Sequence, residues 1–256
     1  MTARSASPGP VDEGAARDAA RRAAVVTDAS ALGLIAFEGP DAADFLQGQL
    51  SNDVRALRPG AGQWTSYNSP KGRMLATLFL WCAPEGTGGP RYLALVAADL
   101  VGPVAKRLAM FVLRAKLSVA DATASHHFFG VGGPAAASAV RAALGDAPAA
   151  GGVLTIRDTT IVHWPDGRLV VVAPAVTAAD TFAALGRVAP KGDGSMWEWL
   201  AVRAGVPMIG AATQDRFVAQ TANWDAIGGL DFRKGCYPGQ EIVARTQHLG
   251  RLKERL

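Results

Sequence analysis

A short segment near the end of the chain concentrates the residue types that can do chemistry. Residues 233–241 read Arg-Lys-Gly-Cys-Tyr-Pro-Gly-Gln-Glu, so one cysteine lies between two glycines, with two cations before it and a carboxylate after it. Nearby positive charge favours a thiolate over a thiol, which makes Cys236 a candidate reactive residue. Tyr237 can stack on a ligand ring, while Gln240 and Glu241 offer amide and carboxylate groups that read the edge of a heterocycle. A free cysteine packed in a tight loop is the structural alternative.

A second basic segment precedes an apolar run of strand length. Lys71-Gly72-Arg73 places two cations and a glycine at the start of that run. A basic loop in this position suits the capture of a carboxylate or a phosphate. A solvated turn explains the same residues equally well, so this segment decides nothing alone.

One glycine-rich turn resembles a dinucleotide-binding pattern only loosely. Residues 130–135 fit G-x-G-x-x-A between a predicted strand, 126–129, and a predicted helix, 134–144. Such a site needs a carboxylate about 20 residues further on, and Asp146 is too early while Asp158 is too late. We therefore interpret the pattern as a plain strand-to-helix turn. The sequence also lacks the spaced histidines, G-x-S-x-G and phosphate-loop patterns of metalloproteases, α/β-hydrolases and P-loop NTPases.

The composition is that of a globular protein with a sizeable core. The chain has 256 residues, 49% of them hydrophobic and 19% charged, and no apolar run approaches the roughly 18–20 residues of a membrane span. Two cysteines cannot form a disulfide framework or a four-cysteine zinc site, so we expect a cytoplasmic protein with no metal site. Cys82 lies in an apolar run and is expected to be buried. The net charge of +4 and the pI near 9.3 fit an anionic small ligand as well as nucleic acid.

Two similar units are predicted to position these segments. In each, two apolar runs of strand length flank a turn-rich loop, at 74–81 with 91–97 and at 161–164 with 169–172. Each pair predicts a β-hairpin. Helix-start signals follow both hairpins, at Asp99 and at Thr177. The repeated hairpin–helix pattern predicts an α+β chain of two related subdomains.

The remaining parts of the chain are less regular. Residues 1–22 are rich in small residues and are predicted to form a flexible tail. Ser195 and Glu198 form a capping-box pattern that predicts a helix beginning there. From residue 214 onward, glycines and polar residues predict an irregular segment laid over the core, and such loops often carry function.

The 234–241 string resembles the signature of the YgfZ proteins, which are folate-dependent iron–sulfur maintenance factors related to the glycine-cleavage T-protein (GcvT), an aminomethyltransferase. Further segments fall in that family's order: Phe45-Leu-Gln-Gly-Gln-Leu-Ser-Asn-Asp-Val54, Lys71-Gly-Arg73, Arg203-Ala-Gly-Val-Pro207 and Gln220-Thr-Ala-Asn223. The resemblance covers about residues 25–256, and the 234–241 string is long and specific.

This resemblance implies an α+β, GcvT/YgfZ-like folate-binding fold of two intertwined ferredoxin-like subdomains. The expected boundaries are a tail at 1–22 and a folate-binding domain at 23–250, in which 23–120 plus 195–250 form one subdomain and 121–194 the other. In the family a C-terminal β-barrel follows, and 251–256 stand where it begins. We therefore expect the barrel to be largely missing from this sequence.

The resemblance also implies a ligand and a role. The ligand is tetrahydrofolate or a derivative, and the role is to support iron–sulfur cluster assembly or repair and, through client enzymes, tRNA modification. The expected partners are the reduced folate and iron–sulfur client or assembly proteins, with no membrane partner. Cys236 is the expected reactive residue. The residues expected to line a central folate cleft are Tyr67, Lys71, Arg73, Gln220, Asn223, Lys234, Gly235, Tyr237, Gly239, Gln240 and Glu241.

Two departures from the T-protein pattern bear on catalysis. T-proteins carry paired acids after the segment matching Lys71-Gly72, whereas residues 73–81 contain no acid, with Leu75, Ala76 and Thr77 in that region. The T-protein glutamate before the Ala-Gly pair is replaced by Arg203. A folate-dependent aminomethyl or C1 transferase is thus the alternative function, and whether the protein is an enzyme at all stays open.

A nucleic-acid-binding module is a third hypothesis. It is prompted by the basic pI and by a C-terminal cluster of Arg245, Arg251, Lys253 and Arg255. Aromatic residues do not alternate with these cations, so base stacking would have no platform. The sequence therefore disfavours direct nucleic-acid binding.

Overall fold

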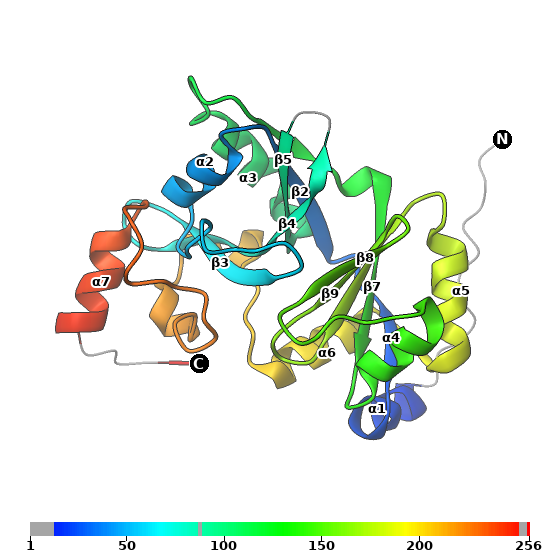
Figure 1. Cartoon of the computed structure of the whole chain (residues 1–256). Coiled ribbons are helices and arrows are strands. Elements are labelled where there is room, and N and C mark those ends of the chain that lie inside the picture. The colour runs from blue at the N-terminus through cyan, green and yellow to red at the C-terminus, as the bar shows by residue number, and fades with distance from the viewer. Residues whose placement is uncertain (1–12, 87–88, 251–254) are drawn as a thin grey trace.

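Two β-sheets organise the protein (Figure 1). The computed structural model describes residues 13–86, 89–250 and 255–256. The six-stranded sheet contains, in spatial order, β11 (Lys191–Gly192), β1 (Val25–Asp28), β7 (His126–Gly132), β10 (Leu169–Pro174), β9 (Thr159–His163) and β8 (Val153–Ile156). The five-stranded sheet contains β3 (Gly62–Asn68), β4 (Met74–Gly86), β5 (Gly89–Ala97), β2 (Leu32–Glu38) and β6 (Ser118–Asp121). All neighbouring strands are antiparallel except β1 and β11, which are parallel.

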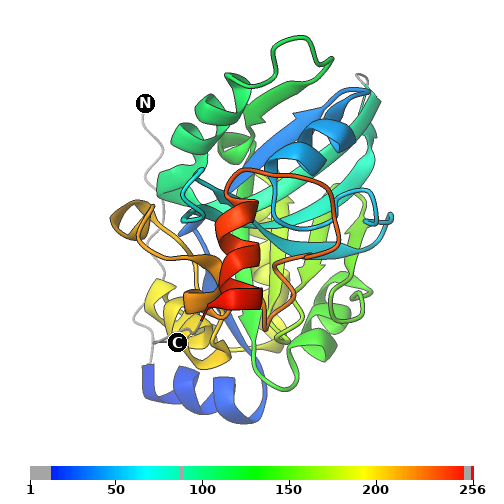
Figure 2. The same ribbon diagram turned by 90° about the vertical axis from the view of Figure 1, so that its left-hand side faces the viewer.

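Helices flank both sheets (Figures 1 and 2). The described α-helices are α1 (Glu13–Arg22), α2 (Ala42–Gln49), α3 (Val101–Ala109), α4 (Ala136–Leu144), α5 (Ala178–Val188), α6 (Gly194–Ala204) and α7 (Gln240–Leu249). Short 3-10 turns are η1 (Ala98–Leu100), η2 (Thr123–Ser125), η3 (Ala211–Thr213) and η4 (Ala219–Ala222). Helices α4 and α5 enclose a small core against the six-stranded sheet, while the larger core lies between the sheets and beneath α2, α3 and α6.

Both predicted hairpins are confirmed. Strands β4 and β5 pair antiparallel, and so do β9 and β10. Helices α3 and α5 follow them, as the sequence predicted. The fold is therefore α+β with a repeated hairpin–helix pattern.

The two sheets meet at their edges through an aromatic cluster. An isolated bridge between Ala61 and Gly152 joins the segments before β3 and β8. Beside it, the ring of Trp64 on β3 lies 4.8 Å from that of Trp164, which in turn lies 5.4 Å from Trp197 of α6. Packed indoles bury much apolar area, so this cluster holds the two halves together.

The glycine-rich turn at 130–135 serves packing. A side chain at Gly130 would collide with the ring of Trp197, and one at Gly132 would meet Leu200 at 2.5 Å. Both glycines lie within β7, where α6 crosses the sheet closely. The strand thus extends to Gly132, beyond the predicted end at 129, and the strand-to-helix turn is confined to 133–135.

Several boundaries differ from expectation. The predicted tail at 1–22 includes helix α1, because Ala16 and Ala20, one turn apart, are buried against the core; residues 1–12 lie outside the described part. Strand β1 belongs to the six-stranded sheet, so the expected segment 23–120 is divided between the sheets, and α6 packs on β1 and β7. The expected barrel start at 251–256 falls mostly outside the described residues.

Two local assignments also differ. Helix α6 is capped by Asp193, whose carboxylate accepts from the Met196 backbone N–H at 3.2 Å, two residues before the expected start at Ser195. The segment after 214 is irregular as expected, but it contains helix α7, since no glycine or proline interrupts 240–249 and Val243 is fully buried on its inner face.

Candidate functional site

The 234–241 loop is anchored by a buried lysine. The Lys234 ammonium donates to the backbone carbonyls of Gln47, Leu50 and Asn52, at the C-terminal end of α2 and just beyond it. A lysine has three N–H donors, so these carbonyls use all of them. A cation at this end of a helix also complements the helix dipole. Lys234 thus fixes the loop. The sequence led us to expect its charge beside Cys236, but the ammonium binds these carbonyls instead.

Burial shifts the ionisation of two groups in this loop. Desolvation lowers the pKa of Lys234 to about 8, although Asp53 and Asp231 act in the opposite direction. Desolvation raises the pKa of Tyr237 to about 12, with a smaller contribution from the charge of Asp231. The Lys234 ammonium lies 5.1 Å from the centre of the Tyr237 ring. Tyr237 is therefore a neutral packing partner of the lysine near neutral pH.

Two glycines interlock the 234–241 loop with the basic turn before β4. Gly72 and Gly239 have φ angles of +69° and +78°, which favour glycine. A Cβ on Gly239 would lie 2.6 Å from Gly72 Cα, and one on Gly72 would lie 2.7 Å from Ile242. The two segments singled out in the sequence, whose glycines Gly72 and Gly239 are 167 residues apart, therefore form one surface. Lys71 and Arg73 are exposed there, and Arg73 donates to the Arg216 carbonyl at 2.6 Å.

The two cysteines lie in different surroundings. Cys236 is exposed at the tip of the loop, whereas Cys82 is half-buried on β4, not fully buried as expected. Burial, helped by the charge of Glu85, raises the pKa of the Cys82 thiol.

We predict that iodoacetamide modifies Cys236 at least tenfold faster than Cys82 in the native protein. The reason is that alkylation requires an accessible thiolate, and both exposure and ionisation disfavour Cys82. Mass spectrometry of timed, quenched reactions measures both rates, and a urea-unfolded sample supplies the control in which the rates converge. Equal native rates would contradict a special role for Cys236.

The other expected cleft residues are dispersed. Tyr67 is buried and its hydroxyl accepts from Arg107 Nε at 3.3 Å, facing α3. Gln220 is fully buried and donates to the Val243 carbonyl of α7 at 2.7 Å. Gly235, Gln240 and Glu241 stay with the loop at the start of α7. Asn223 instead lines a large groove, described next.

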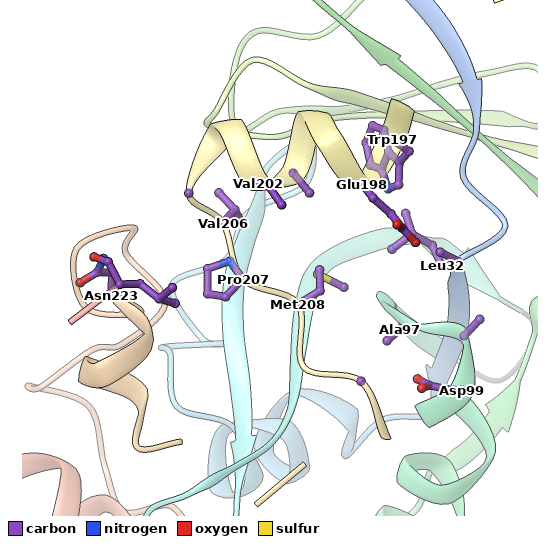
Figure 3. A pocket seen from close by; sticks show the side chains of 16 residues that line it. Leu32, Ala97, Asp99, Trp197, Glu198, Val202, Val206, Pro207, Met208 and Asn223 are labelled. Atoms are coloured by element: carbon purple, nitrogen blue, oxygen red, sulfur yellow. The ribbon is translucent and has the colours of Figure 1, made fainter. Parts of the chain in front are cut away.

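This groove, called here the α6 groove, has a volume of about 790 Å³ (Figure 3). It runs from Asn223 at one end to Asp99 at the other, with α6 along one wall and the ends of β2 and β5 along the opposite wall. Its lining residues are Ala31, Leu32, Ala97, Ala98, Asp99, Trp197, Glu198, Ala201, Val202, Gly205, Val206, Pro207, Met208, Gly210, Asn223 and Leu256.

The α6 groove is apolar with a few polar groups. Two carboxylates face it, Asp99 and Glu198; Asp99 also accepts from the Ala211 backbone N–H at 2.9 Å. An amphipathic ring fits such a lining, because apolar walls cover its faces while polar groups read its edge. Of the lining residues, only Asn223 was expected from the sequence. One signal was available: Val202 is apolar but lies off the stripe of Trp197 and Leu200 along the helix, and in the structure it is 80% exposed.

The positions of the missing T-protein acids are occupied by packing residues. Leu75, Ala76 and Thr77 are all buried, and Thr77 Oγ1 accepts from the Ile209 N–H at 3.0 Å. Arg203 lies on α6 with its guanidinium 4.9 Å from the Trp199 ring. These positions therefore supply no carboxylate.

Two further observations concern the part of the chain that the structure describes. No helix there is long and apolar enough to cross a bilayer, and no three His, Cys, Asp or Glu residues there are grouped to hold a metal ion. Of the basic C-terminal cluster, Arg255 forms an ion pair with Asp225 at 2.7 Å, while Arg251 and Lys253 fall outside the described residues.

Comparison with known proteins agrees with this architecture. Residues 12–165 match the family described as the GCVT N-terminal domain. The tRNA-modifying protein YgfZ of Serratia proteamaculans is 32% identical over 226 residues, covering 87% of this chain and 67% of the relative; the Klebsiella pneumoniae protein of the same name is 31% identical with the same coverage.

A solved structure shows the same fold. Aminomethyltransferase T of the glycine cleavage system from Bartonella henselae superposes with a TM-score of 0.75 at 19% identity, covering 89% of this chain and 64% of that one. The chain thus spans less than two thirds of that neighbour's length. With the family match over more than half of its residues and the similarity to the YgfZ relatives, the chain belongs to the YgfZ family of GcvT-like proteins.

Proposed function

We propose that this protein binds tetrahydrofolate or a close derivative and supports iron–sulfur cluster assembly or repair and, through client enzymes, tRNA modification. The observation that carries the proposal is the α6 groove, whose size and lining suit a reduced folate. The names of the YgfZ relatives support the tRNA-related role, and the GcvT-like fold supports the ligand class.

The lining of the groove suits both the polar edge and the apolar surface of a pterin ring. The pyrimidine half of a tetrahydropterin is flat with N–H donors on its edge, and carboxylates such as Asp99 and Glu198 are acceptors for such donors. Trp197 and Met208 offer apolar cover for the ring. Of the expected contacts, Asn223 lies in this groove, so the proposal retains it and adds the carboxylates.

The groove is linked to the loop that carries Cys236. Asn223 follows η4 directly, and Gln220 within η4 donates to α7, which begins where the loop ends. A ligand that shifts Asn223 therefore acts on an element bonded to α7. In this proposal the folate organises the loop and Cys236 acts on, or contacts, the iron–sulfur client.

We predict that Ala201→Phe lowers the affinity for tetrahydrofolate at least tenfold. Ala201 lines the groove from α6, so a larger side chain there fills the space that the ring needs. Anaerobic isothermal titration calorimetry measures the affinity. The matched control is Ala183→Phe, at an exposed position of α5, which should bind as the wild type does.

If Ala201→Phe binds tetrahydrofolate as tightly as the wild type, the folate does not bind in this groove. If the wild type does not bind tetrahydrofolate at all, the proposal is overturned.

The role of Cys236 is tested separately, in cells lacking the endogenous protein. Cys236→Ser should fail to restore the activity of iron–sulfur enzymes while Cys82→Ser restores it. Equal restoration by both variants would exclude a special role for Cys236.

A further inference from the structure

A second pocket lies on the opposite side of α6 from the folate-sized groove. It has a volume of about 470 Å³, within the usual range for small-molecule sites. Residues of α1, of the turn before α4, of the β9–β10 turn and of α6 line it. We name it the basic pocket, because Arg21, Arg168 and Arg203 line it against one carboxylate, Asp166. Three cations minus one anion leave a formal charge of +2.

A buried arginine in this pocket has an unused donor. Arg168 is 3% exposed, and its guanidinium lies beside the paired rings of Trp164 and Trp197, 4.7 and 4.9 Å from their centres. Nε and Nη2 donate to Asp166, whereas Nη1 has no hydrogen-bond partner among the described residues. A buried charged donor without a partner is energetically unfavourable. Because this atom is buried from solvent, the Arg168 guanidinium adds positive potential to the pocket wall without presenting a donor at the opening.

The other two arginines of the pocket are exposed and lie beside the same tryptophan ring. Arg21 from α1 and Arg203 from α6 lie 5.8 and 4.9 Å from the centre of the Trp199 indole. Both guanidinium groups are charged, so together they raise the positive potential on this side of α6. Their placement comes from separate elements, so it does not follow from one local charged run.

The start of α4 adds to the positive potential. Gly133, Pro134 and Ala137 line the pocket, and no side chain caps this nine-residue helix. The N-terminal end of a helix dipole favours anions. Leu200 and Ala204 supply an apolar wall beside the cations.

We propose that the basic pocket binds a small organic phosphate. The charge of +2 matches the −1.5 to −2 of a phosphomonoester at neutral pH, guanidinium forks bind phosphate oxygens in pairs, and the apolar wall accommodates the carbon part of the ligand. This site is separate from the folate groove, so its existence does not depend on the function proposed above.

The test is calorimetric titration with pyrophosphate, with citrate as a carboxylate of comparable charge and sodium chloride at matched ionic strength. The expected result is saturable binding of pyrophosphate, weakened at least tenfold in Arg203→Gln and in Arg21→Gln. That change corresponds to about 1.4 kcal/mol. Arg187→Gln removes an exposed cation from α5 and should bind within twofold of the wild type. Arg168 is too deeply packed to separate binding from folding, so the exposed arginines are the informative positions.

Further arms distinguish this site from the alternatives. Ala201→Phe should leave pyrophosphate binding unchanged, while Arg203→Gln should leave tetrahydrofolate binding unchanged. Equal affinity for citrate would overturn the assignment to phosphate. Non-saturating heats, or equal weakening in Arg187→Gln, would show general charge attraction and overturn the site. If a short RNA binds through Arg21 and Arg203 and pyrophosphate does not displace it, the ligand is a nucleic acid and the proposal fails.

Discussion

Replacing Lys234 by methionine is expected to lower the free energy of unfolding by about 2–4 kcal/mol. The substitution keeps most of the apolar stem but removes the ammonium that three backbone carbonyls share. Each buried carbonyl left without a partner costs about 1–3 kcal/mol, and the loss is partly offset because a desolvated charge disappears. Against a typical stability of about 5–15 kcal/mol, this is a large fraction.

Urea denaturation followed by tryptophan fluorescence measures the change. The matched control is Lys71→Met, since Lys71 is exposed in the adjoining turn and its loss should change stability by less than about 0.5 kcal/mol. A Lys234→Met protein as stable as the control would mean that the 234–241 loop is not held by this lysine.

The same variant has an expected pH dependence. The pKa of Lys234 in the folded protein, about 8, is below its usual 10.5. Between these values the unfolded chain binds more protons than the folded protein, so wild-type stability rises with pH there. Below pH 8 Lys234 is protonated in both the folded and the unfolded state, so burial of its charge lowers the wild-type free energy of unfolding by a constant amount. The stability difference between wild type and Lys234→Met should therefore grow from pH 8 to 10; a constant difference would contradict the lowered pKa.

The second large effect concerns catalysis: in a reconstituted glycine-cleavage assay, this chain should turn over at least 100-fold more slowly than a T-protein. Aminomethyl transfer needs a placed carboxylate to manage a developing positive charge and its proton. The segment that carries acids in T-proteins is here buried and apolar, at Leu75 and Ala76. Arg203, at the position of the second acid, lines the basic pocket and supplies no carboxylate to the α6 groove.

A T-protein shortened to the region that matches this chain controls for the difference in length between the two proteins. Asp99 and Glu198 in the α6 groove are the carboxylates that could substitute, so Asp99→Asn and Glu198→Gln are measured alongside. Turnover within tenfold of a T-protein, a gap of only about 1.4 kcal/mol, would overturn the prediction and favour the transferase.

Much of the architecture was predictable because its signals are local. Pro165-Asp166-Gly167 between two apolar runs encodes its hairpin within a dozen residues, and the structure confirms it. Helix α1 shows the limit of the same reasoning. Its small residues suggested a tail, yet Ala16 and Ala20 are buried by a surface formed from distant strands.

The candidate site was only partly predictable. The sequence alone determined the family, through the 234–241 string, and the absence of acids at 73–81, because both are properties of consecutive residues.

Tertiary structure decided what those residues do. Lys234 binds carbonyls more than 180 residues away, and Gly72 meets Gly239 across the fold. The α6 groove and the basic pocket lie on opposite sides of one helix, where residues two positions apart, Ala201 and Arg203, face different elements. Such pairings depend on which surfaces pack together, and no spacing along the chain encodes them.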